Sequence, residues 1–86
     1  IVDNNPVICG VRIDKNYTKL NSTNFRWKPA GSSLGGHAQL IVGYDDKKQT
    51  FTLENSWGKD FGKNGTLEIS YDDFREVSFD YFRIII

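Results

Sequence analysis

Two apolar segments joined by a short polar turn constrain the fold of this chain more than any other feature. Residues 37–44 form a largely apolar run, and residues 50–55 alternate between apolar and polar side chains as a half-buried strand does. Between them, residues 45–48 are all charged and form a polar turn. Two strands with so short a polar connection are expected to pair as an antiparallel hairpin.

The rest of the chain adds strands and very little helix. Three further segments have the β-branched and aromatic composition of strands: residues 7–13, 66–70 and 79–86. Single helical turns are expected within residues 17–20 and 71–77, and loops at the glycine-rich segments 29–36 and 56–65. About five strands with little helix predict a mainly β fold, an antiparallel sheet curled into a partial barrel.

Length and composition limit the domain count and the classes of partner. The 86 residues suffice for one small domain over 1–86, and six Phe, four Tyr and two Trp can fill its core. The formal net charge is zero, and no basic run is interleaved with aromatic residues, so no nucleic-acid partner is expected. No apolar stretch approaches the roughly 20 residues of a membrane-spanning helix, so no membrane partner is expected either.

The start of the chain and its single cysteine say little about its compartment. The sequence contains no methionine, and residues 1–6 do not resemble a signal peptide, so we expect it to begin inside a longer precursor or to be trimmed. Cys9 is the only cysteine, which rules out an internal disulfide. Glycosylation triplets begin at Asn16, Asn21 and Asn64, but such triplets arise readily by chance. The localisation therefore stays unknown.

His37 is the only histidine and lies where a glycine-rich loop enters an apolar strand. A histidine so placed on a rigid scaffold is suited to proton transfer, because its ordinary pKa lies near neutrality. Taken alone, such a residue is more often a histidine without a catalytic role. A single histidine is also a poor basis for a zinc site, so no metal is expected.

Asn55 ends the second strand of the expected hairpin and could lie close to His37. Its side-chain oxygen could accept a hydrogen bond from one imidazole nitrogen and thereby fix the ring and its tautomer. Trp57, two residues later, could cover that bond and exclude water. The simpler interpretation is a turn asparagine beside a core tryptophan, and without His37 it would be preferred.

In order and spacing, four segments resemble the C-terminal half of the papain family of cysteine proteases. They are Gly36-His37-Ala38, Val42-Gly43-Tyr44, Asn55-Ser56-Trp57-Gly58 and residues 61–65. The family pairs a catalytic histidine with the asparagine of an Asn-Ser-Trp-Gly motif and usually has tryptophan where this chain has Phe61. Residues 6–8 also resemble the strand that opens the right-hand β domain of that α+β fold.

The resemblance implies a role for each matching residue. His37 would be the general base and acid, Asn55 its orienting partner, and Trp57 the shield of their hydrogen bond. Gly36 would help to bind substrate, and the pocket for the second substrate residue before the cleaved bond would include Gly10 and Ala38. No cofactor is implied, and the substrate would be a peptide or protein.

The catalytic cysteine of the family is absent from this sequence. In the family it opens a helix in the N-terminal half, shortly after a glutamine that helps to hold the oxyanion. Cys9 lies inside an apolar β segment with no helix N-terminus to lower its pKa, so a buried structural thiol is expected. The implied partner is a Cys-bearing N-terminal half, on a separate chain or in a precursor, and the chain alone is expected to be inactive.

Two other functions stay open at this stage. A protease-like β domain could serve as a non-catalytic binding or regulatory module, and a transglutaminase or amidase would also use a Cys–His pair. The Asn-Ser-Trp-Gly context of Asn55 disfavours the latter. If the helical half is missing, apolar surface should be exposed around His37, Trp57 and Trp27, and the isolated chain should self-associate or require its partner.

Overall fold

The fold is an open antiparallel sheet that bends around one core. The structure, a computed structural model, describes residues 7–83 and the side chains of residues 7–79. Within that range it contains β1 (Val7–Ile13), α1 (Lys15–Thr18), β2 (Gly35–Asp45), β3 (Thr50–Glu54), β4 (Thr66–Ser70), α2 (Tyr71–Val77) and β5 (Ser78–Arg83). The strand order is β4-β3-β2-β1-β5, and every neighbouring pair is antiparallel.

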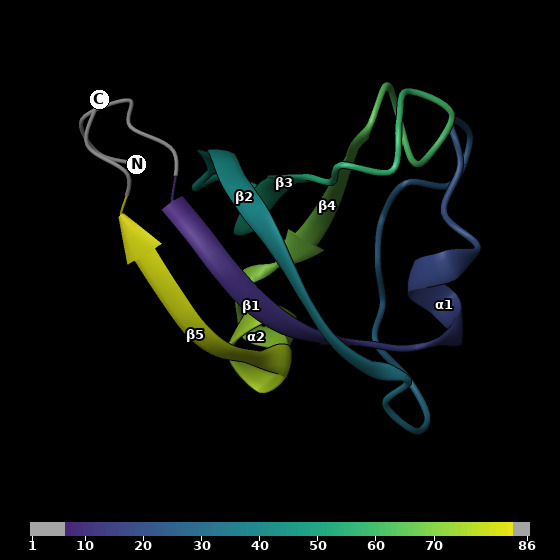
Figure 1. Ribbon diagram of the computed structural model, residues 1–86. Helices are drawn as coiled ribbons and strands as arrows, with labels where there is room; N and C mark the ends of the chain where they lie inside the picture. The colour runs from purple at the N-terminus through teal and green to yellow at the C-terminus, as the bar shows by residue number, and fades with distance from the viewer. Residues whose placement is uncertain (1–6, 84–86) are drawn as a thin grey trace.

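The sheet curls, so that β2 passes in front of β3 and β4, while β5 forms the opposite edge at the lower left, beside β1 (Figure 1). α2 lies below the sheet, and α1 with the long loops occupies one side of the molecule (Figure 1). The predicted mainly β fold, an antiparallel sheet curled without closing, is confirmed. No helix in the described part of the chain is long and apolar enough to cross a membrane.

Side-chain caps explain where the two helices differ from the prediction. α1 begins at Lys15, earlier than the predicted turn, because the Asp14 carboxylate accepts a hydrogen bond from the backbone N–H of Tyr17 at 3.0 Å. Ser70 caps α2 in the same way, its hydroxyl oxygen accepting from the N–H of Asp73 at 3.0 Å. α2 therefore extends over seven residues, not one turn. The last predicted strand is confirmed as far as the description reaches, and residues 84–86 lie outside it.

One face of the sheet carries the core. Alternate residues of the strands point inward, and α2 adds two more apolar side chains to the same cluster. The buried apolar residues are Cys9, Val11, Tyr17, Leu20, Trp27, Ile41, Leu53, Phe61, Leu67, Ile69, Phe74 and Val77. The loops before β2 and after β3 thus contribute Trp27 and Phe61 to the same core as the strands.

Trp27 corrects one sequence-based expectation. It was expected among the exposed apolar residues, yet it is fully buried. Its indole N–H donates to the Asp14 carboxylate at 3.0 Å, and the same carboxylate accepts from the backbone N–H of Ala30 at 2.8 Å. Tyr17 packs edge-on against the indole, with ring centroids 4.8 Å apart. A buried acceptor for its N–H and an aromatic neighbour let this tryptophan enter the core.

Candidate active site

The β2–β3 hairpin brings His37 and Asn55 together. Leu40 pairs with Glu54 in the hairpin, and Asn55 follows directly after β3. The chain then turns back, and the N–H of Asn55 donates to the carbonyl of Gly65 at 3.0 Å. In this arrangement, His37 Nε2 lies 2.8 Å from Asn55 Oδ1.

This contact defines the tautomer of the imidazole. An amide oxygen can only accept a hydrogen bond, so Nε2 must carry the proton. In the neutral ring, Nδ1 is then the basic nitrogen. Asn55 is only 5% exposed, and burial strengthens a hydrogen bond by lowering the local dielectric. His37 therefore has the geometry of a base whose ring is held in one orientation by the Asn55 oxygen.

Aromatic rings pack beside His37. The rings of Trp57 and His37 are tilted by 44° with centroids 4.9 Å apart, and Phe61 packs edge-on against Trp57 at 5.0 Å. Trp57 itself stays 46% exposed, on a loop and not on a strand. Phe61, which replaces the tryptophan usual in the resembling family, is buried and contacts the Trp57 ring from the core.

A cavity of about 270 Å³ gathers the three residues predicted to bind substrate. Gly10 pairs with Ala38 across β1 and β2, and Gly36 lies two residues before Ala38. His37 also contributes to the lining, and the remaining lining residues are Ile8, Cys9 and Phe79. All three predicted residues therefore lie beside the candidate base, around one concave site.

Phe79 is a lining residue that the sequence reasoning did not identify. A β-bulge lets it project beside β1, because Ser78 pairs with Val11 and residue 80 pairs with Gly10. Its ring covers both glycines: a side-chain Cβ built on Gly10 would lie 2.9 Å from the ring, and one on Gly36 would lie 3.1 Å from it. Phe79 is nevertheless 56% exposed. A phenylalanine within an apolar strand gives no sequence signal of such a position, although a glycine in the middle of β1 hints at a close neighbour.

Cys9 is the buried thiol that the sequence predicted. It lies in the core with no exposed surface, and burial raises the pKa of its thiol to about 11. A thiol with such a pKa is almost entirely protonated near neutral pH, and the thiolate is the nucleophilic form. Among the described residues, no group of three or more His, Cys, Asp or Glu side chains could hold a metal ion.

Cys9 should accordingly resist thiol reagents in the native chain. At pH 7.5 we expect an aromatic disulfide reagent to react about 100-fold or more slowly in buffer than in urea, because burial lowers both access and thiolate fraction. The pKa of the Cys9 thiol is about 11 in the folded chain against an ordinary value of 9.0, so the folded chain holds the thiol proton more tightly than the unfolded chain does. The protonated thiol therefore contributes fully to the stability of the fold below pH 9, and this contribution is lost as the pH rises from 9 to about 11. Rapid native labelling at pH 7.5 would contradict the buried assignment.

The chain is similar to known proteins in sequence and in fold. The sequence profile described as papain family cysteine protease matches residues 1–81. An uncharacterised peptidase C1-like protein of Acanthamoeba polyphaga mimivirus is 31% identical over 71 residues, which cover 77% of this chain and 22% of that protein. Cathepsin B-like cysteine proteinase 3 of Ostertagia ostertagi is 33% identical over 67 residues, covering 76% and 38%.

A solved structure gives the same result for the fold. Xylellain, a cysteine protease from Xylella fastidiosa, superposes with a TM-score of 0.77 at 25% identity, over 98% of this chain and 34% of that protein. The chain thus spans well under half the length of each of these relatives.

Proposed function

The chain belongs to the papain family of cysteine proteases, and we propose that it supplies the general base and the orienting residue for peptide-bond hydrolysis. His37 is the base and Asn55 its orienting partner. The nucleophilic thiol comes from a Cys-bearing N-terminal half, on a separate chain or in a longer precursor. The observation that carries the proposal is the 2.8 Å contact between His37 Nε2 and Asn55 Oδ1. The assembled protease means, below, this chain together with that half.

In the first half-reaction, Nδ1 of His37 takes the proton of the thiol. The resulting thiolate attacks the carbonyl carbon of the scissile peptide bond. The oxyanion is stabilised mainly by donors of the other half. When the C–N bond breaks, the imidazolium gives its proton to the leaving amine, and the acyl group stays on sulfur as a thioester.

In the second half-reaction, His37 acts as base again. It takes a proton from water, and the oxygen of that water attacks the thioester carbonyl. The C–S bond breaks, the acid product leaves, and the thiol recovers its proton from the imidazolium. Throughout, the Asn55 oxygen keeps Nε2 protonated and Nδ1 free for transfer, while Trp57 covers their bond.

The cavity beside His37 is the proposed seat of the second substrate residue before the cleaved bond. Gly10, Gly36 and Ala38 leave room on the strands, and the Phe79 ring bounds that room. Cys9 has no exposed surface, so apart from glycine backbone and His37 the lining side chains are Ile8, Ala38 and Phe79, and an apolar substrate side chain fits the cavity best. Phe79 would then limit the size of that side chain.

Shortening Phe79 should therefore change substrate preference. In the assembled protease, Phe79→Ala is expected to raise the kcat/KM ratio of peptides with a large aromatic side chain over those with a small one by about tenfold, because the pocket widens. A panel of fluorogenic peptides that differ at this one position measures the ratio. Tyr44→Ala, at an exposed position near the far end of β2, serves as the control and should leave the ratio unchanged. An unchanged ratio in Phe79→Ala would remove Phe79 from the pocket.

The proposed activity is tested by asking which thiol it requires. The assembled protease, isolated from its natural source or co-expressed, is expected to hydrolyse peptides and to lose activity on treatment with iodoacetamide. A Cys9→Ala variant should keep the activity and the same sensitivity to iodoacetamide, since Cys9 is buried and its thiol is protonated. Loss of activity in Cys9→Ala with normal folding would contradict the proposal. A natural assembly that binds peptides without cleaving them would instead favour a binding or regulatory module.

A further inference from the structure

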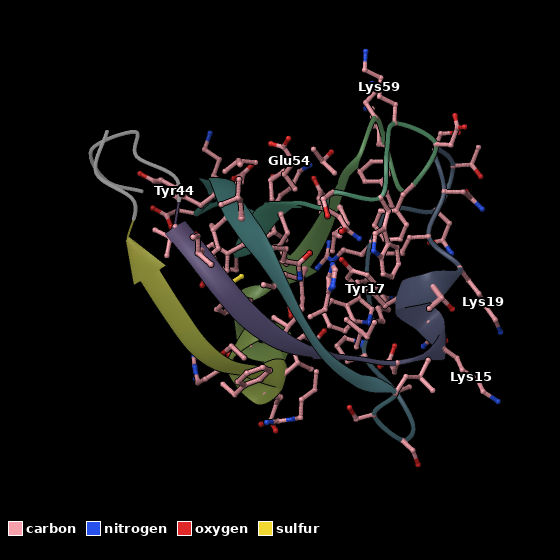
Figure 2. The ribbon with its side chains drawn as sticks, in the orientation of Figure 1. Lys15, Tyr17, Lys19, Tyr44, Glu54 and Lys59 are labelled. Carbon is pink, nitrogen blue, oxygen red and sulfur yellow. The ribbon has the colours of Figure 1, made fainter. Side chains whose placement is uncertain are left out.

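Tyr17 occupies a position between the core and the candidate active site. It has no exposed surface, and within the described chain it is the one buried residue of α1. Figure 2 shows its side chain directed from α1 toward the interior beside β2, whereas Lys15 and Lys19 of the same segment point away from the molecule. A tyrosine at such a site needs a partner for its hydroxyl, because a buried hydroxyl is costly when unpaired.

Hydrogen bonds hold Tyr17 at both ends. Its backbone N–H donates to the Asp14 carboxylate at 3.0 Å, and its hydroxyl donates to the side-chain oxygen of Gln39 at 2.7 Å. Burial raises the pKa of the Tyr17 phenol well above its ordinary value, so the hydroxyl keeps its proton over the whole range of ordinary pH. The ring is therefore fixed along its length between α1 and β2.

Gln39 connects the Tyr17 hydroxyl to β2, the strand that also carries His37. It lies on β2 two residues after His37, so the two side chains leave the same face of the sheet. Gln39 is only 5% exposed, and its amide nitrogen has no hydrogen-bond partner among the described residues. Its hydrogen bond with Tyr17 satisfies the side-chain oxygen and is the only side-chain hydrogen bond that Gln39 makes within the described part of the chain. An apolar residue would fill the space without leaving a donor unpaired.

The Tyr17 ring also touches both rings of the site. Its edge-on contacts have centroid distances of 5.4 Å to Trp57 and 6.0 Å to His37. Phe61 lies against it at 5.1 Å. Trp57 stands on a loop, and its ring packs on Tyr17 and Phe61, so the Tyr17 ring is one of its two core-side supports. Trp57 in turn packs on His37 at 4.9 Å.

We infer that Tyr17 is a positioning residue for the His37–Asn55 pair, which it aligns through its hydrogen bond to Gln39 and its ring contacts with Trp57 and His37. This inference rests on the proposed function, because the alignment of His37 and Asn55 matters for catalysis only if the two residues have the proposed roles. A purely space-filling role would need the ring alone. The hydroxyl also fixes the orientation of the ring. A buried hydrogen-bonded pair such as Tyr17 and Gln39 has few favourable arrangements, whereas two apolar side chains can pack in many.

The test removes the hydroxyl and reads the imidazole directly. Because His37 is the only histidine, its two nitrogen signals in a ¹⁵N NMR spectrum of the full chain are unambiguous. In Tyr17→Phe we expect the ratio of the Nε2–H to the Nδ1–H tautomer of His37 to fall about three- to tenfold. A change of this size is expected because one hydrogen bond no longer aligns the ring with Asn55. Tyr71→Phe is the matched control: it also removes a 2.7 Å phenol hydrogen bond, to Asp46, but should leave the His37 signals unchanged.

A second variant separates positioning from stability. Tyr17→Phe leaves the Gln39 oxygen unpaired and could unfold the chain, whereas Tyr17→Phe/Gln39→Leu replaces both partners with apolar groups and should restore the melting temperature. The inference predicts that the His37 tautomer ratio stays altered in this stable double variant. Wild-type His37 signals in the double variant, or in a folded Tyr17→Phe, would overturn it. Since the measurement needs no cysteine, a failure here is distinct from a failure of the proposed proteolysis.

Discussion

Replacing His37 with alanine in the assembled protease is expected to lower kcat/KM for peptide hydrolysis by at least about 10³-fold, because the thiol loses its base and the leaving amine its acid. Asn55→Ala should cause a smaller loss, since the base stays but its tautomer is no longer fixed. Initial rates with a fluorogenic peptide below its KM give both values. The folded fraction of each variant, from circular dichroism, excludes unfolding as the cause.

Lys59→Ala is a suitable control for both variants. Lys59 lies on the same loop as Trp57 but is exposed, and its side chain points away from the site (Figure 2). Its removal should leave kcat/KM within about twofold of the wild-type value, as expected of a surface substitution. A His37→Ala enzyme as active as Lys59→Ala would show that the base is another group.

Substituting Gly62 with alanine is expected to destabilise the domain by about 2–5 kcal/mol. Gly62 is buried with φ at +58°, and a Cβ there would overlap the backbone carbonyl oxygen of Thr66. The clash is with backbone, so no side chain can move aside to relieve it. The turn that presents the Gly65 carbonyl to Asn55 would have to shift. Urea unfolding followed by Trp fluorescence measures the loss.

Gly31→Ala is the control for Gly62→Ala, because it makes the same change at another glycine. Gly31 also has a positive φ, +79°, but a Cβ there would meet no atom within 4 Å. Only the cost of the left-handed conformation applies, about 1–2 kcal/mol. Equal destabilisation by the two variants would mean that the turn at Gly62 tolerates a side chain and does not hold Asn55 in place.

The hairpin and the His37–Asn55 pair were predictable because both depend on local patterns. The apolar run of β2, the charged turn and the alternation of β3 determine the pairing, and the pairing determines which residues meet at its end. Their hydrogen bond is the expected contact, while the catalytic roles stay a prediction until activity is measured. The expectation that the isolated chain self-associates likewise stays a prediction: of the two tryptophans that it named, Trp57 is exposed and Trp27 is buried.

The contacts that the sequence did not reveal are those between distant segments of irregular structure. Asp14 begins a polar stretch of the sequence, yet its carboxylate accepts hydrogen bonds from Tyr17, Trp27 and Ala30 in the interior. No periodicity predicts such a carboxylate, because the partners come from a loop whose path depends on the finished core. Phe79 was missed for a related reason, since only the bulge between β1 and β5 turns it over the glycines.

The central claim is that this chain activates a cysteine that lies outside residues 1–86. The most direct measurement is to treat the assembled protease with a peptidyl epoxide, which alkylates activated thiols, and to map the adduct by mass spectrometry of its peptides. We expect one adduct, on a cysteine of the other half, and its loss when His37 is replaced by alanine. An adduct on Cys9, or equal labelling with and without His37, would contradict the account.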